Sequence, residues 1–206
     1  MNTFDQKARN WDKDPARIAR TEAFARSVID FMKPDGSQYA LEFGCGTGLL
    51  GFALKDHFKS VTLADTSAGM LEVVNEKIAS LQNPNVSPLL ADILEEEVSL
   101  PAFDLLTSML TFHHIPSPAS AFQKLSKLIK PGGFMIIADV MPEDGSFHEA
   151  GEFQLVHKGF SKDQIYLWFE QAGFQPLLYS EFAFIEKNKD NKPQKYPLFW
   201  AVGKKA

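Results

Sequence analysis

The chain has 206 residues, of which 45% are hydrophobic and 23% charged, and it contains one cysteine. This length allows one sizeable hydrophobic core and is too short for two, and the composition excludes a disordered chain and an internal disulfide. No apolar run is long enough to span a bilayer, and 26 acidic against 21 basic residues give a net charge of −5, which does not attract nucleic-acid phosphates. We therefore expect one globular domain over residues 1–206, with no membrane or nucleic-acid partner.

Residues 1–33 are expected to form an N-terminal arm and a helix. Basic and acidic residues alternate in the arm and no apolar signal core follows, so we expect no targeting peptide and a cytoplasmic protein. Apolar residues recur at helical spacing over residues 15–32, and Pro34-Asp35-Gly36 ends that helix.

An apolar strand over residues 38–43 is followed directly by three alternating glycines. The run reads Leu41-Glu42-Phe43-Gly44-Cys45-Gly46-Thr47-Gly48. Only a residue without a Cβ lets the chain leave a strand through unusual dihedrals while its amides stay open to a ligand. The run therefore predicts a loop that binds a nucleotide-like cofactor, followed by a helix over residues 48–57. Cys45 is expected to be a small packing residue beside the cofactor and not a reactive thiol.

Hydrophobic periodicity predicts alternating strands and helices after this loop. Strands are expected over residues 60–65, 86–91, 103–108 and 134–139, and helices over residues 66–81, 117–129 and 161–172. Thr66 or Ser67 is a plausible N-cap, and Pro131-Gly132-Gly133 is expected to end the helix before the fifth strand.

The end of the chain has two strands with no helix between them. Residues 175–185 and 196–202 must therefore pair antiparallel across a loop over residues 187–194. Together these elements predict an α/β fold with a Rossmann-like, doubly wound, seven-stranded sheet that is parallel except for a C-terminal antiparallel hairpin. Residues 38–139 would form the cofactor-binding half, and residues 140–206 the substrate segment and the hairpin.

Two of the predicted parallel strands lead into acidic residues. Asp65 ends the second strand, where a ribose hydroxyl pair would lie, and Asp92 and Ile93 follow the third strand. Because ligands bind at the carboxyl ends of parallel strands, these residues are expected to share one crevice with the glycine loop.

A dinucleotide-dependent oxidoreductase is one alternative for this crevice. The residues from Gly46 through Gly48 to Gly51 fit the loose pattern G-x-G-x-x-G. However, the sequence has no Tyr-x-x-x-Lys pair, and a dehydrogenase sheet would continue with parallel strands where this chain ends in a hairpin.

Several further motifs accompany the glycine run. They are Asp65-Thr66-Ser67-Ala68-Gly69-Met70-Leu71, Ala91-Asp92, Phe103-Asp104-Leu105-Leu106, Phe112-His113-His114-Ile115 and Leu128-Ile129-Lys130-Pro131-Gly132-Gly133. With these motifs the chain resembles the class I S-adenosylmethionine-dependent methyltransferases, of the small bacterial type that acts on small molecules. The resemblance implies methyl transfer from S-adenosylmethionine to a small-molecule acceptor, with S-adenosylhomocysteine as the product. A binding protein that has lost this activity is a further alternative.

The same resemblance implies which residues contact the cofactor. The expected set is Trp11, Glu42, Gly44, Cys45, Gly46, Gly48, Asp65, Thr66, Met70, Asp92, Ile93, Ser108 and Met109. Within it, Asp65 would hold the ribose hydroxyls, Met70 would cover one face of the adenine, and Asp92 would bind the adenine amino group. Ser108 and Met109 would line the sulfonium end. In related sequences an aromatic residue near this N-terminal position closes over the cofactor. That residue is commonly tyrosine, whereas this chain has Trp11.

The implied reaction is a direct in-line displacement at a methyl group that a positive sulfonium already activates. Positioning the nucleophile can supply roughly 7–11 kcal/mol of such a barrier, more than a general base usually provides. If the acceptor is a hydroxyl or an acidic carbon, His113 or His114 is the best-placed base. The alternative is that one histidine shapes the loop before Pro116. Asp139, at the end of the fifth strand, either faces the substrate or caps the next turn.

We expect no metal ion from the sequence. The fourth strand ends in Ser108, where metal-dependent catechol methyltransferases carry an acid. His148, Glu149, Glu152 and His157 lie near one another in the sequence but lack the H-E-x-x-H spacing.

Overall fold

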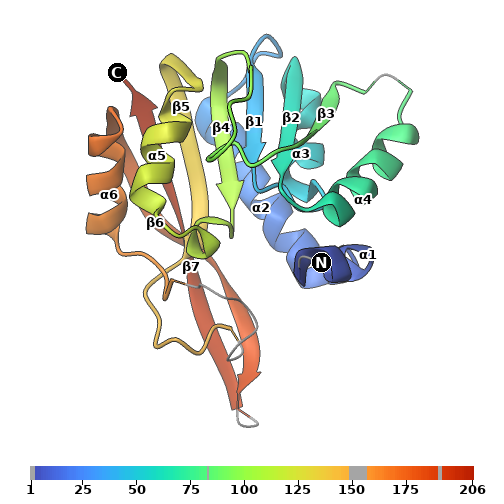
Figure 1. Cartoon of the computed structure of the whole chain (residues 1–206). Helices are drawn as coiled ribbons and strands as arrows, with labels where there is room; N and C mark the ends of the chain where they lie inside the picture. Colours follow the sequence, from blue (N-terminus) through green and yellow to red (C-terminus); the bar gives the residue numbers. More distant parts are fainter. Residues whose placement is uncertain (1–2, 83, 149–156, 190–191) are drawn as a thin grey trace.

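The computed structural model describes residues 3–82, 84–148, 157–189 and 192–206. Its centre is a seven-stranded sheet in the order β3-β2-β1-β4-β5-β7-β6 (Figure 1). The strands are β1 (Tyr39–Phe43), β2 (Ser60–Asp65), β3 (Val86–Leu90), β4 (Phe103–Met109), β5 (Ile129–Val140), β6 (Phe174–Lys189) and β7 (Lys192–Lys205). Strands β1 to β5 pair in parallel, and β7 pairs antiparallel with both β5 and β6. The predicted Rossmann-like fold is confirmed.

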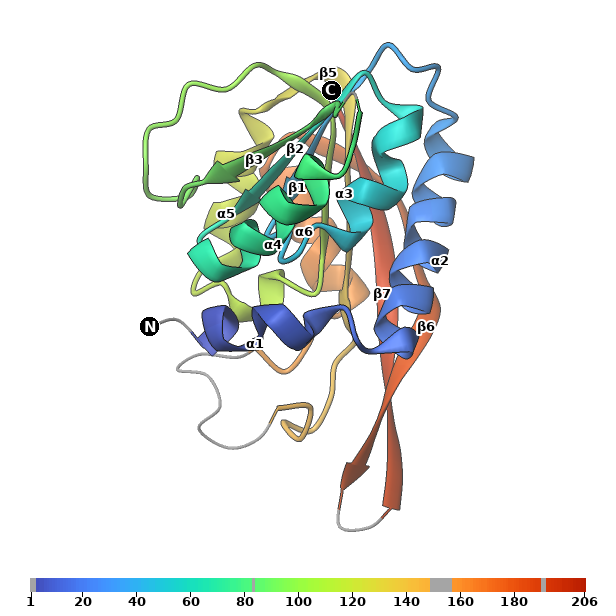
Figure 2. The same cartoon turned by 90° about the vertical axis from the view of Figure 1, so that its right-hand side faces the viewer.

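Helices cover both faces of the sheet (Figure 2). They are α1 (Thr3–Trp11), α2 (Pro15–Met32), α3 (Leu49–Leu54), α4 (Ala68–Ala79), α5 (Pro118–Ser126) and α6 (Lys162–Gln171), with short 3-10 turns η1 (Lys55–His57) and η2 (Phe112–His114). Phe24, Leu54 and Val74 bring α2, α3 and α4 into one core cluster, whereas Phe122 and Phe169 bring α5 and α6 into the cluster on the opposite face. None of the helices in the described ranges is both long enough and apolar enough to cross a membrane.

Side-chain caps explain where several helices begin. Asp14 accepts a hydrogen bond from the Ala16 amide at 2.9 Å and starts α2. Ser67, one of the two predicted caps, accepts from the Met70 amide at 3.2 Å and starts α4. Ser161 and Gln164 form a reciprocal capping box at the start of α6. These caps fix the ends of helices next to the carboxyl edge of the sheet.

The helix predicted over residues 117–129 is longer than the helix observed there. Helix α5 ends at Ser126, and β5 already begins at Ile129, which pairs with Phe103. Pro131-Gly132-Gly133 therefore lies inside β5, where the pairing register with β4 shifts. Proline and glycine occur both at helix ends and at irregularities within strands. The sequence of this segment was therefore interpreted as the end of a helix.

The C-terminal hairpin is longer than predicted. The predicted loop over residues 187–194 is wrong, because Lys187 pairs with Gln194 and Lys189 with Lys192. The lysine-rich sequence hid these strands, since lysine has a weak preference for strands. The hairpin extends past the rest of the sheet at the carboxyl ends of the parallel strands (Figures 1 and 2). Helix α1, which was not predicted, lies near the same edge.

Candidate cofactor and acceptor site

The carboxyl ends of β1, β2 and β3 bring together the loops that were predicted to bind the cofactor. The amides of Gly44 and Cys45 donate to the Ala64 carbonyl at 2.9 and 3.0 Å, which ties the glycine loop to the end of β2. Asp65 pairs with Leu90 on β3, so Asp92 follows two residues beyond that pair. These contacts confirm that the three loops after the strands share one edge of the sheet.

The glycine loop has the backbone geometry that its sequence requires. Gly44, Gly46 and Gly48 have φ values of 68°, 54° and 79°, which L-residues with a Cβ rarely adopt. A Cβ built on Gly46 would lie 3.7 Å from Nε1 of Trp11 and 3.9 Å from Sδ of Met70. The loop therefore faces two of the side chains that the resemblance assigned to the cofactor, which fits a flat nucleoside.

Asp65 holds the loop and keeps capacity for a ligand. Its carboxylate accepts hydrogen bonds from the amides of Gly46 at 2.7 Å and Ser67 at 2.9 Å. Each oxygen of an ionised carboxylate has a second lone pair that can accept from a hydroxyl. Burial raises the pKa of Asp65, and the backbone hydrogen bonds oppose that rise. A ribose diol would add two more donors to this desolvated carboxylate.

Helix α1 carries Trp11 to the crevice through polar contacts with α4 and the glycine loop. Asp5 accepts from the Ser67 hydroxyl at 2.6 Å and from the Gly69 amide at 3.0 Å. Asp12 accepts from the Thr47 hydroxyl at 2.6 Å and pairs with Lys77 at 2.6 Å. Figure 2 shows α1 lying across the lower edge of the domain. The sequence analysis did not predict the contacts of Asp5, Asp12 and Lys77, because their partners are far away in the chain.

Glu42 lies beneath the glycine loop. Its side chain is 3% exposed and its Oε2 accepts from the Gly51 amide at 2.8 Å, in the first turn of α3. Burial raises the pKa of Glu42 to about 8. Burial also raises the pKa of the Cys45 thiol, so this thiol stays protonated, in agreement with a packing role. Glu42 therefore links the end of β1 to the start of α3. Its hydrogen bond to Gly51 could not be predicted from the sequence.

Four further residues of the predicted set lie along the same edge. Ser108 is buried and donates to the Phe43 carbonyl at 2.7 Å, so its hydroxyl joins β4 to β1. Asp92 accepts from the Leu94 amide at 3.1 Å. Ile93 is buried, and Thr66 is exposed. The polar contacts of Ser108 and Asp92 shape the loops that border the crevice.

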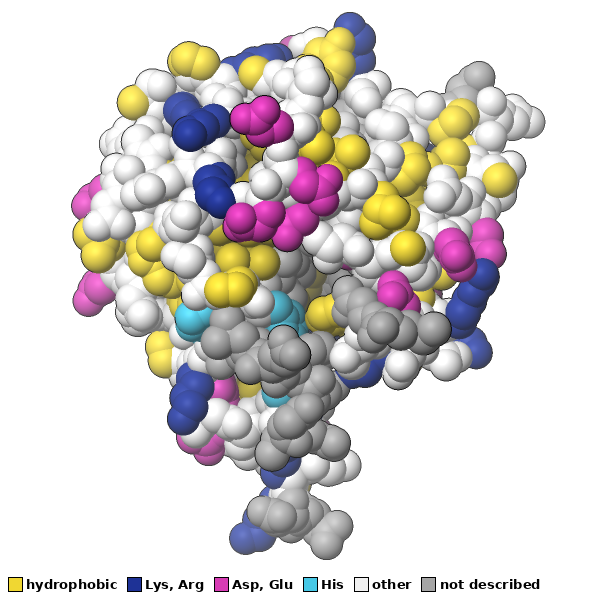
Figure 3. Space-filling view, viewed as in Figure 1, with side chains coloured by type: hydrophobic (Ala, Val, Ile, Leu, Met, Phe, Trp, Pro, Cys, Tyr) yellow, Lys and Arg dark blue, Asp and Glu magenta, His cyan; other side chains and the backbone are white. Residues whose placement is uncertain are grey.

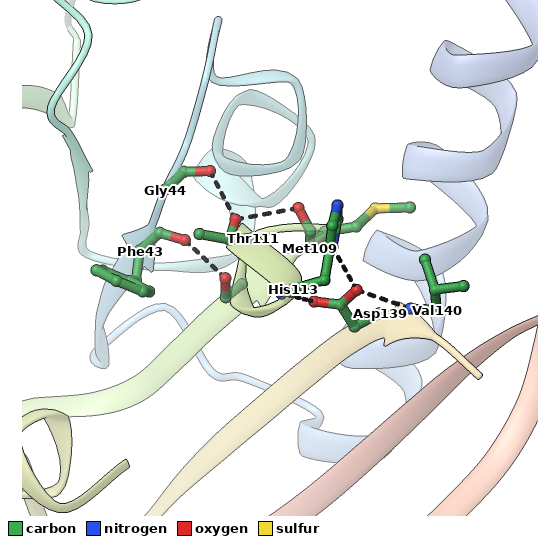
Figure 4. A network of polar contacts seen from close by, with 8 residues as sticks. Phe43, Gly44, Met109, Thr111, His113, Asp139 and Val140 are labelled. Carbon is green, nitrogen blue, oxygen red and sulfur yellow. Dashed lines mark hydrogen bonds and ion pairs between the residues drawn. The ribbon is translucent and has the colours of Figure 1, made fainter. Parts of the chain in front are cut away.

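A pair of buried polar residues, His113 and Asp139, which were predicted to face the acceptor, lies beyond the ends of β4 and β5. Nδ1 of His113 lies 2.6 Å from Oδ1 of Asp139, and the His113 amide donates to Oδ2 at 3.2 Å (Figure 4). The Val140 amide also donates to Oδ1 at 2.7 Å. A proton on Nδ1 that is shared with Asp139 leaves Nε2 of His113 as the ring atom able to accept a proton or bind a metal ion.

A strained turn connects this pair to the glycine loop. Leu110, directly after β4, has a φ of 57°, which is unusual for a residue with a branched side chain. Thr111 then donates to the Gly44 carbonyl at 3.3 Å (Figure 4). Met109 is half-buried at the end of β4. The cofactor loop and η2 are thus joined by one hydrogen bond, so the two sides of the site are held next to each other.

Two further histidines lie beside the pair. The ring of His114 lies 4.1 Å from that of His113, and the ring of His148 lies 5.1 Å from that of His114 and 5.2 Å from that of His113. Figure 3 shows histidine side chains reaching the surface on this face of the molecule. His157 instead binds the Ile115 carbonyl at 2.9 Å and supports the loop. Glu149 and Glu152, considered above as possible metal ligands, lie outside the described residues.

Comparison with known proteins places the chain in a family. A family model described as a methyltransferase domain matches residues 41–135. An uncharacterised methyltransferase of Schizosaccharomyces pombe is 31% identical over 160 residues, which cover 71% of this chain and 56% of the relative. The solved structure of the N-methyltransferase NodS from Bradyrhizobium japonicum, in complex with S-adenosyl-L-homocysteine, has a TM-score of 0.71 and 16% identity, covering 100% of this chain and 99% of that one.

The chain carries a methyltransferase domain with the fold of the class I S-adenosylmethionine-dependent methyltransferases.

S-adenosylmethionine is the cofactor that defines this class of methyltransferases. A ubiquinone biosynthesis O-methyltransferase of Paracidovorax citrulli is also 31% identical, over 114 residues that cover 54% of this chain and 48% of the relative. The chain thus spans about half the length of the curated relatives it matches. The family match includes the glycine loop, Asp65, Asp92 and η2, and it ends before Asp139. The residues predicted to bind the cofactor from Glu42 to Met109 therefore lie in the matched region, and Asp139 and His148 lie beyond it.

Proposed function

We propose that this methyltransferase transfers the methyl group of S-adenosylmethionine to a small-molecule acceptor by direct in-line displacement. The observation that carries the proposal is the hydrogen bond from Thr111 to Gly44, because it joins the glycine loop to the buried pair of His113 and Asp139.

The residues around the glycine loop fit the cofactor. Asp65 would accept the ribose hydroxyls, and Met70 and Trp11 would bound the nucleoside on either side of Gly46. Asp92 and Ile93 would lie at the adenine end, and Met109 at the end nearest to η2. When bound, the cofactor supplies a methyl group on a positively charged sulfur, so its departure needs no acid.

On the acceptor side, this chain positions the nucleophile and receives its proton. In-line alignment can supply roughly 7–11 kcal/mol of the barrier. Asp139 fixes the ring of His113, and His114 lies against that ring on the side of α1. The acceptor atom gains the methyl group as the C–S bond breaks, and its proton passes to Nε2 of His113, whose other ring nitrogen is held by Asp139.

A small acceptor is supported by charge and by what surrounds the site. The net charge of −5 opposes binding to nucleic-acid phosphates. Phe4 on α1 contacts His114 edge-on at a ring distance of 5.3 Å, which narrows the approach to the histidines. A compact molecule fits such an approach better than a folded macromolecule does.

Calorimetric titration with S-adenosylhomocysteine, and in parallel with NAD and NADP, tests the cofactor assignment. We expect binding of S-adenosylhomocysteine alone. Asp65→Ala should weaken it by about 1.5–3 kcal/mol, roughly 10-fold to 150-fold, because charged hydrogen bonds to ribose are lost. Asp56→Ala is the matched control, since Asp56 has a side-chain exposure of 79% in η1. Equal affinity in both variants would contradict the role of Asp65, and binding of a dinucleotide alone would overturn the proposed function.

A second measurement separates an active enzyme from a binding protein. Formation of S-adenosylhomocysteine from S-adenosylmethionine should increase when small phenols, amines or thiols are supplied as acceptors. A protein that binds the cofactor product but gives no acceptor-dependent turnover with any of these classes would contradict methyl transfer.

A further inference from the structure

We propose that His113, His114 and His148 bind a divalent transition-metal ion, with Zn²⁺ as the best chemical fit. One ring nitrogen from each of the three residues lies within 4.8 Å of the other two. Imidazole is a good ligand for zinc, and zinc sites with three histidines keep a fourth position open. This cluster could not be predicted from the sequence, because His148 is far from the adjacent pair in the chain and none of the usual zinc spacings occurs.

The second layer around His113 is already that of a metal ligand. Histidines that bind metals almost always donate their other ring N–H to a carboxylate, a carbonyl or water, which fixes the tautomer and makes the ligand nitrogen more basic. Nδ1 of His113 lies 2.6 Å from the fully buried carboxylate of Asp139. This contact leaves Nε2 as the ring nitrogen available to a metal ion, and the negative charge of Asp139 would partly offset that of the cation.

To bind a tetrahedral ion, the three nitrogens must approach one another by at most about 1.5 Å. A tetrahedral ion with zinc–nitrogen distances of 2.0–2.1 Å requires ligand atoms roughly 3.3 Å apart. His113 is held by Asp139, so the adjustment falls on His114 and His148, both of which are only half-buried. Rotation about their side-chain bonds can supply displacements of this size without moving the sheet.

The C-terminal hairpin places His148. The preceding residue, Phe147, packs in a small cluster with Val140, Tyr196 and Leu198, and Lys187 donates to the Phe147 carbonyl. One residue earlier, Ser146 bonds the Tyr196 hydroxyl through both its own hydroxyl at 2.8 Å and its carbonyl at 3.0 Å. The hairpin therefore holds Ser146 and Phe147, the two residues before His148, and this places His148 next to η2.

Aromatic side chains surround the cluster. Phe147 lies edge-on to His113 and His148, with ring distances of 5.8 and 4.7 Å, and Phe4 lies edge-on to His114. An apolar shell of this kind limits water around a bound ion and suits a flat aromatic ligand. We therefore assign the open position to an acceptor with an ionisable hydroxyl on an aromatic ring.

The chemistry of that step is balanced without a further reactant. With the ion bound, Nε2 of His113 is a ligand and no longer accepts the proton. Coordination instead lowers the pKa of the hydroxyl, and its proton leaves to solvent. A lone pair of the resulting oxygen forms the new O–CH3 bond as the C–S bond breaks, and that electron pair stays on the sulfur. This catalytic role rests on the proposed methyl transfer, whereas metal binding by the three histidines does not.

Zinc binding by the purified full-length protein tests the site. The protein is stripped with a chelator, incubated with Zn²⁺, separated from unbound metal and analysed for zinc, with Co²⁺ absorption spectra as a second probe. We expect about one zinc per chain and a tetrahedral Co²⁺ spectrum. His148→Ala and His148→Gln should each weaken zinc binding at least about 10-fold, and Asp139→Asn by about 10-fold to 100-fold. His57→Ala, which removes an exposed histidine on η1, should bind zinc like the wild type.

The same preparations are titrated with S-adenosylhomocysteine to show that each variant is folded. Wild-type protein with no more zinc than a blank, or His148 variants with unchanged zinc affinity and an unchanged Co²⁺ spectrum, would overturn the metal site. Zinc binding without binding of S-adenosylhomocysteine would contradict the proposed function and leave the metal site standing.

Discussion

The proposed cofactor side and the proposed acceptor side of this methyltransferase are built in different ways. The glycine loop, Asp65 and Asp92 follow three successive strands, so each comes from a separate but regular strand-to-helix unit. The acceptor side collects η2, the end of β5, the segment at Phe147 and His148, and the base of the hairpin. The first side depends on local backbone geometry, and the second on contacts between distant parts of the chain.

The two sides therefore place different requirements on the fold. The cofactor side needs glycines and a buried acid at fixed spacings, so a change there acts directly on the loop. The acceptor side needs several segments to be held together, so a change at its base is expected to act on His148 without touching the glycine loop. The following predictions test that separation, from the largest expected effect to the smallest.

The first prediction concerns Glu42, which supports the cofactor loop. Its pKa is raised from 4.5 to about 8 by burial, so between these values the folded protein keeps a proton that the unfolded chain releases. Stability should therefore fall as pH rises through this window, by at most about 1.4 kcal/mol per pH unit. Glu42→Gln should remove this slope. Denaturant unfolding at several pH values measures it, with the exposed Glu181→Gln as control; identical slopes in Glu42→Gln and the wild type would contradict the assignment.

The second prediction concerns Gly159, which follows β5 on the acceptor side. It has a φ of +74°, and a Cβ there would lie 2.1 Å from the Met141 carbonyl oxygen. Gly159→Ala should cost about 3 kcal/mol of unfolding free energy, from strain in the backbone and from a clash with backbone that cannot rotate away. Gly173→Ala is the matched control, because Gly173 has a φ of +80° and nothing within 4 Å of such a Cβ. Its cost should be about 1–2 kcal/mol. Equal losses would show that the close approach to Met141 is unimportant.

The third prediction tests the hold of the hairpin on Ser146. Tyr196→Phe removes both hydrogen bonds to Ser146 and should cost about 1–2 kcal/mol of stability, because two polar atoms lose a buried partner. Tyr179→Phe removes a hydrogen bond from β6 to the Phe160 carbonyl and serves as the control. Both variants should bind S-adenosylhomocysteine normally, whereas only Tyr196→Phe should weaken zinc binding. A reduced affinity of Tyr196→Phe for S-adenosylhomocysteine would contradict the prediction that the two sides respond independently to substitution.

The smallest effect is expected at Asp12, which ties α1 to the glycine loop. Asp12→Ala removes contacts to Thr47 and Lys77 and should weaken binding of S-adenosylhomocysteine by about 1 kcal/mol, roughly 5-fold, because Trp11 is held less firmly. Asp30→Ala changes an exposed acid on α2 and should leave the affinity unchanged. Calorimetry on both variants measures the difference. Unchanged affinity in Asp12→Ala would show that α1 does not help to close the cofactor crevice.

The sequence allowed most of the cofactor side to be predicted. Alternating glycines after an apolar strand, and an acid at the end of the next strand, impose a particular backbone path and a particular edge of the sheet. The register that places Asp65 beside the loop follows from this path. The roles of Asp65, Met70 and Asp92 toward a bound cofactor stay predictions.

The acceptor side could be predicted only in part. The adjacent histidines and Asp139 were singled out, but their contact depends on the side-by-side ends of β4 and β5. His148 could not be placed, because its position depends on the hairpin and on Tyr196, far along the chain. Helix α1 was missed for a similar reason, since its support comes from Ser67, Thr47 and Lys77, which no short sequence window contains.

Strand β7 is the last element of the chain, yet it lies between β5 and β6 in the sheet. During synthesis on the ribosome, the elements of the glycine loop emerge well before the strand that anchors Ser146 and Phe147. A nascent chain that ends before Tyr196 therefore has its cofactor loop but no support for the opposite wall of the site. The support that β7 gives to Ser146 and Phe147 therefore becomes available only after the residues of the glycine loop have been synthesised.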